Sequence, residues 1–108
     1  PYFELHAVGG HDEFISFLPR QVPAAEVEIK PAPYQRLVQR GTTRKDGRDI
    51  PFTECAYEHD GKQWRQIFYA VPLASTETVV IRAQASEPNV DLLFQAAHEA
   101  AATLIPLN

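Results

Sequence analysis

The side chains best suited to chemistry gather near the start of the chain. His6, His11, Asp12 and Glu13 carry imidazole and carboxylate groups, which are common metal ligands and proton carriers. Their spacing matches no metal-binding pattern, and Gly9-Gly10 leaves the geometry between them open. We therefore predict no metal site and no cofactor. These residues remain the basis of one alternative, a small enzyme or an accessory domain of an enzyme.

Other candidate catalytic residues lack a necessary partner. His98-Glu99 begins like the zinc-protease motif, but Ala102 stands where the second histidine would be needed. Cys55 and His59 share a face of one expected strand, without an orienting acid on that face. Free cysteines are usually small buried hydrophobes. We predict no catalytic residue among them.

Glu54 and Glu58 form a further pair of acidic groups, and Arg65 is expected opposite the residue between them. A carboxylate pair performs acid–base chemistry only in a pocket that perturbs its pKa values. A cross-strand Glu–Arg pairing is the simpler interpretation. No glycine pattern of a phosphate-binding loop is present in the sequence.

Composition sets limits on the class of protein. The 108 residues, 44% hydrophobic and 22% charged, indicate one globular domain over residues 1–108. A net charge of −4 argues against nucleic acid as a partner. The basic residues between positions 36 and 48 flank an expected turn and are interpreted as solvated charge, and they are Arg36, Arg40, Arg44, Lys45 and Arg48.

Three further features concern context. Cys55 is the only cysteine, so no intrachain disulfide forms, which favours a reducing compartment such as the cytoplasm. No apolar run approaches the roughly 18 residues of a membrane span. The chain begins at Pro1 and contains no methionine, so we expect a piece of a longer protein.

The first third of the chain gives an ambiguous pattern. Residues 2–8 alternate weakly, as a strand would. The stretch "HDEFISFLP" fits either a short helix capped by Asp12 or a short strand, and Pro19 is expected to end either one. Three prolines between residues 21 and 33 allow only a short or edge strand there.

From Tyr34 onward the pattern indicates hairpins. Asp46-Gly47 and Asp60-Gly61 each separate two alternating runs, and Asp-Gly favours the type I′ turn of a two-residue hairpin. "TVVIRAQA" continues the sheet with Val79, Ile81, Ala83 and Ala85 on one face.

A two-residue loop at Asp60-Gly61 fixes the strand register. It places Tyr57 opposite Trp64, Cys55 opposite Gln66 and Thr53 opposite Phe68 on one face. The other face then pairs Phe52 with Tyr69, Glu54 with Ile67, and Ala56 with Arg65. The face of Phe52, Ile67, Tyr69 and Val71 is more apolar, so we expect it to carry the core.

The C-terminal segment has a helical period. Its apolar residues recur at spacings of three and four along one stripe, with Pro88 before it and Pro106 after it. We expect this stripe to be buried on the sheet, and it comprises Val90, Leu93, Phe94, Ala97, Ala101, Leu104 and Ile105. The predicted fold is α+β, an antiparallel meander with a C-terminal helix packed on one face.

The hairpin "RDIPFTECAYEHDGKQWRQIFYAVP", the strand "TVVIRAQAS" and the helix "PNVDLLFQAAHEAAATLIP" together resemble the PsbP-like superfamily, which includes the DcrB-like bacterial proteins. The resemblance covers about two thirds of the chain and departs most in the N-terminal part. It implies an antiparallel sheet flanked by helices. It implies no common activity, because members are mostly noncatalytic lipoproteins, assembly factors or secretion-associated chaperones.

These observations favour a noncatalytic protein-binding or assembly module. Its expected contact surface is the less apolar face of the sheet, with Trp64, Tyr57, Arg36 and Arg40 toward a protein partner or a second copy of the chain. The alternative for this face is a cover of N-terminal residues such as Phe14 and Phe17.

Overall fold

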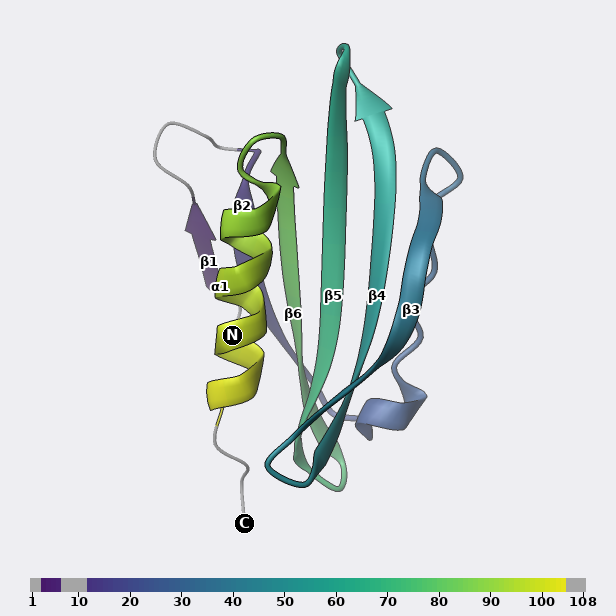
Figure 1. The fold of residues 1–108 in the computed structure, drawn as a ribbon. Coiled ribbons are helices and arrows are strands. Elements are labelled where there is room, and N and C mark those ends of the chain that lie inside the picture. The colour runs from purple at the N-terminus through teal and green to yellow at the C-terminus, as the bar shows by residue number, and fades with distance from the viewer. Residues whose placement is uncertain (1–2, 7–11, 105–108) are drawn as a thin grey trace.

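The fold is a single layer of sheet with one helix on one side. The computed structural model describes residues 3–6 and 12–104, which form a six-stranded antiparallel sheet in the order β1-β2-β6-β5-β4-β3 (Figure 1). The strands are β1 (Phe3–His6), β2 (Phe14–Arg20), β3 (Arg36–Lys45), β4 (Arg48–His59), β5 (Lys62–Ala74) and β6 (Glu77–Ser86). The helix α1 (Val90–Thr103) packs against β6, β5 and β2. The predicted α+β class is confirmed.

The two Asp-Gly pairs form the predicted turns. Asp60 and Gly61 have φ angles of 51° and 74°, and Asp46 and Gly47 have φ angles of 52° and 77°. Positive φ at both central residues is the requirement of a type I′ turn. The register from β4 to β5 is the predicted one, with Tyr57 opposite Trp64 and Phe52 opposite Tyr69.

The sensitivity of the β4–β5 turn provides a direct test. Gly61→Val should lower the free energy of unfolding by about 1–2 kcal/mol, because a β-branched residue is strained at positive φ. An added Cβ at position 61 would meet no atom within 4 Å, so the cost is one of backbone conformation alone. Gly61→Asn, which tolerates this conformation, should cost less. Equal losses in chemical denaturation of the two variants would contradict this turn geometry.

The N-terminal third resolves to strands. "HDEFISFLP" contains β2, which lies between β1 and β6. The expectation that Pro19 ends the segment is wrong, since β2 continues to Arg20. Among the described residues, β1 pairs with residues 14–17 and Pro19 pairs only with Val79 of β6, and a position with one neighbouring strand loses less by lacking an N–H. Residues 21–35 contain one 3-10 turn, Ala24–Glu26.

The apolar face of the sheet carries the core, as predicted. Ile67, Tyr69 and Val71 of β5 and alternate residues of β6 lie under α1. Of the predicted stripe, Val90, Leu93, Ala97 and Ala101 are buried. Phe94 and Leu104 pack on the core but are only partly buried, and Ile105 lies outside the described residues.

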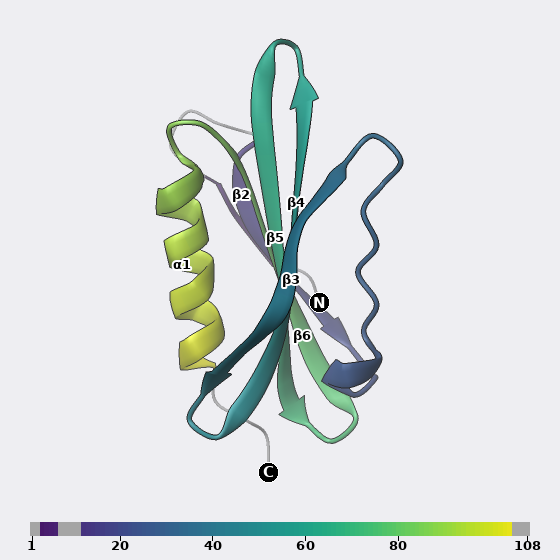
Figure 2. The ribbon, with the colours of Figure 1, turned by 45° about the vertical axis from the view of Figure 1, so that its right-hand side comes forward.

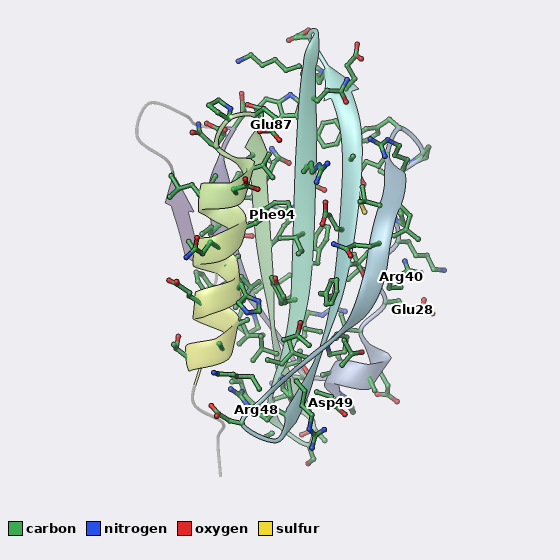
Figure 3. All side chains as sticks on the ribbon, viewed as in Figure 1. Glu28, Arg40, Arg48, Asp49, Glu87 and Phe94 are labelled. Carbon is green, nitrogen blue, oxygen red and sulfur yellow. The ribbon has the colours of Figure 1, made fainter. Side chains whose placement is uncertain are left out.

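Arg48 joins the lower hairpin to the end of the helix. Its Nη2 donates to the carbonyl oxygen of Leu104 at 2.8 Å, and its Nη1 donates to that of Pro72 at 3.3 Å (Figure 3). The interpretation of this arginine as solvated turn charge is therefore wrong. A cation at the C-terminus of a helix also meets the negative end of the helix dipole.

Candidate functional site

The face of the sheet opposite α1 is the less apolar face that sequence analysis selected. Figure 2 shows α1 on one side of the sheet and the strap, defined as residues 27–35, on the other. Arg40 Nη2 donates to the Ile29 carbonyl at 2.8 Å, and Gln35 Nε2 donates to Gln66 Oε1 at 2.7 Å. The strap therefore covers part of this face through side-chain hydrogen bonds.

Trp64 does not present its indole to solvent. Only 8% of the residue is exposed, and its ring stacks on Tyr57 with 6.4 Å between centroids and 11° between planes. Its Nε1 is buried without a hydrogen-bond partner in the described part of the chain. The expectation of an exposed tryptophan at the centre of a contact surface is wrong, and Trp64 belongs to the packed interior of this face.

Tyr57 and Tyr34 continue this aromatic cluster toward the surface. Tyr57 is half-buried and meets Tyr34 edge-on at 5.3 Å, while 69% of Tyr34 is exposed. Burial raises the pKa of the Tyr57 hydroxyl, and the neighbouring Tyr34 and Asp12 raise it further. The Tyr57 hydroxyl therefore keeps its proton at neutral pH.

Arg36 and Arg40 lie on opposite faces of the sheet. Arg36 pairs with Ala56 on the helix side, whereas Arg40 pairs with Thr53 on the strap side. The cause is an irregularity between Leu37 and Gln39, where β3 holds one residue more than β4. The four predicted contact residues therefore do not form one surface, although both arginines are exposed along the same edge strand.

The edge strand β3 is exposed along most of its length. Its ten residues pair with β4 on one side, and no backbone hydrogen bond from the rest of the described chain reaches its other side. The basic residues of β3 are all exposed, and they are Arg36, Arg40, Arg44 and Lys45. Leu37 is an exposed apolar side chain between them, with 47% of its surface accessible.

The glutamine network is a feature that sequence analysis missed. Gln35 donates to Gln66, Gln66 donates to Gln84, and Gln84 Nε2 donates to the backbone oxygen of Asp12 at 2.8 Å. Gln66 is 8% exposed, so these bonds satisfy a buried amide. The strand register could have indicated this network, because Gln66 of β5 and Gln84 of β6 are direct cross-strand partners.

Glu13 and Cys55, two of the ionisable candidates, are buried. Glu13 is 9% exposed and binds Ser86 and Asn89, neither of which is ionisable. Burial raises the pKa of the Cys55 thiol, which lowers its thiolate fraction. His11 lies outside the described residues, as does the side chain of His6.

Glu54 also has structural partners. Glu54 is 4% exposed and accepts from Arg65 Nη1 at 3.0 Å and from Gln39 Nε2 at 2.9 Å. The predicted Glu–Arg pairing is therefore present, with a buried carboxylate. Within residues 12–104, no group of three or more His, Cys, Asp or Glu side chains is placed to hold a metal ion.

A comparison with protein-family models finds no match, and neither does a comparison with curated protein sequences. The kinship with the PsbP-like superfamily stays a prediction. In the part of the chain that the structure describes, no helix is long and apolar enough to cross a membrane.

Proposed function

We propose that this chain is a noncatalytic protein-binding module that accepts an extended acidic segment of a partner as an additional strand along β3. The observation that carries the proposal is the open ten-residue edge of β3. An exposed edge offers a row of backbone N–H and C=O groups, and strand addition uses them for affinity. The side chains along the edge then select the partner.

The charge of β3 selects the sign of the partner. Arg36 lies on the helix side of the edge and Arg40 on the strap side, so acidic side chains of an added strand would meet a cation on either face. A second copy paired through the same edge would bring these cations close to those of its own kind, which disfavours a homodimer of this type. Tyr34 and Leu37 add exposed apolar contact area at one end of the strand.

The test uses two synthetic peptides of equal length, one alternating valine with glutamate and one alternating valine with lysine. The glutamate peptide should bind more tightly, should weaken as salt is added, and should shift the backbone amide resonances of β3 in nuclear magnetic resonance spectra. Arg36→Glu should weaken binding about fivefold or more, through loss of attraction and added repulsion.

Lys62→Glu is the matched control, since Lys62 is an exposed cation at the start of β5, which β4 separates from the β3 edge. It makes the same charge change and should reduce affinity far less. Equal binding of the two peptides, an equal effect of the two variants, or resonance shifts confined to other strands would each contradict strand addition at β3.

A further inference from the structure

A groove on the strap side of the sheet lies apart from the β3 edge. It has a volume of about 320 Å³, and its lining residues come from β2, β6, β5 and the strap, namely Ser16, Leu18, Arg20, Ile29, Phe68, Val80 and Arg82. This volume is at the lower end of the range of small-molecule sites. The floor follows the strand register, because Arg82 lies between Ser16 of β2 and Phe68 of β5.

The groove combines an apolar wall with a half-buried cation. Leu18, Ile29, Phe68 and Val80 supply the wall, and 41% of Leu18 is exposed. Arg82 is half-buried, its guanidinium lies over the Phe14 ring at 4.8 Å from the centroid, and its Nε is buried without a hydrogen-bond partner. Among the described residues, no acidic side chain forms an ion pair with Arg82.

A buried donor without an acceptor is unfavourable in a folded protein, and each such group calls for an explanation. The phenyl ring of Phe14 attracts the guanidinium through its face but offers no lone pair to the Nε–H. The Nε–H itself is enclosed, but Arg82 is only half-buried and lines the groove. A carboxylate in the groove can therefore accept charge-assisted hydrogen bonds from the guanidinium, and partial burial strengthens them.

We propose that the groove binds an amphiphilic monocarboxylate, with the carboxylate on Arg82 and an unbranched alkyl chain along Leu18, Val80 and Ile29. The opposite orientation would place the carboxylate on Arg20, four residues beyond Ser16 and about 13 Å along β2. Arg20 is exposed to solvent, where an ion pair contributes little. The carboxylate therefore lies at the Arg82 end of the groove.

The experiment titrates the protein with octanoate below its micelle concentration and follows the Nε–Hε resonance of Arg82. Octanoate should bind saturably and shift this resonance, and octan-1-ol should bind about tenfold more weakly for want of the charge. Lengthening the acid from hexanoate to octanoate should tighten binding by up to about fourfold for each added methylene that is buried.

Two pairs of variants separate this site from surface charge. Arg82→Gln should weaken octanoate binding about tenfold or more, whereas Arg20→Gln should change it less than about twofold. Leu18→Glu, at an exposed position, should abolish binding of the acid by repulsion, while Leu18→Gln should retain part of it. Thermal melting of each variant establishes that it is folded.

The outcomes that would overturn this proposal differ from those that would contradict strand addition at β3. They are equal affinity for octanoate and octan-1-ol, a larger loss with Arg20→Gln than with Arg82→Gln, unchanged binding in Leu18→Glu, or no saturable binding at millimolar octanoate. None of these measurements uses the peptides that probe β3, so either proposal can fail alone.

Discussion

Leu93→Ala should lower the free energy of unfolding by about 2–5 kcal/mol. Leu93 is 7% exposed and belongs to the core between α1 and the sheet. Removing its side chain takes away apolar contact and leaves a cavity, because the alanines beside it on the helix cannot move inward to fill the space. For a domain of about this size, each kcal/mol lowers Tm by roughly 4–8 °C.

Leu92→Ala is the matched control for this prediction. The same side chain is removed one position earlier in α1, where 68% of Leu92 is exposed. Its effect on the free energy of unfolding should stay within about 0.5 kcal/mol. Chemical denaturation of both variants measures the difference, and similar losses for Leu92 and Leu93 would mean that α1 does not dock on the sheet by this face.

The sequence was sufficient to predict the fold from β4 to α1 because the decisive signals there are local. Asp60-Gly61 requires a turn with positive φ, and the alternation on either side then determines which residues oppose each other. The period of three and four in α1 is likewise contained within one helix. Each of these features depends on neighbours that are close in the chain.

The structure of the N-terminal third depends on contacts between residues that are far apart in the chain. The letters of β2 fit a helix or a strand equally well, and pairing with β6 decides between them. Among the described residues, Pro19 pairs with β6 alone, and which strands lie beside it is a property of the assembled sheet. Neither fact is contained in the local sequence.

The expected grouping of the four contact residues on one face is wrong for a related reason. Regular alternation places Arg36 and Arg40 on one face, but the additional residue between Leu37 and Gln39 separates them, and no glycine marks that irregularity. The expectation of an exposed Trp64 rests on a strand whose two faces both carry aromatic and polar residues. Stacking on Tyr57 accounts for part of its burial. The groove around Arg82 needs β2, β5, β6 and the strap together, so no single segment indicates it.

Glu13→Ala is expected to have the second large effect on stability, about 2–4 kcal/mol. Its carboxylate accepts from the Ser86 backbone N–H at 3.1 Å, from the Ser86 hydroxyl at 3.4 Å, and from Asn89 Nδ2 at 2.9 Å. These bonds connect Glu13, the residue before β2, to the end of β6 and to Asn89, the residue before α1. Alanine would leave the buried Ser86 N–H without its acceptor, and that loss is the main cost.

Asp12→Ala is the control for this carboxylate, because Asp12 is exposed and its described hydrogen bond uses only its backbone oxygen. It should change the free energy of unfolding by less than about 0.5 kcal/mol. In a double-mutant cycle, Glu13→Ala and Asn89→Ala should show a coupling energy of about 0.5–3 kcal/mol. Additive effects of the two substitutions, or a Glu13→Ala variant as stable as the parent, would contradict a structural role for Glu13. Glu13 would then again be a candidate for chemistry.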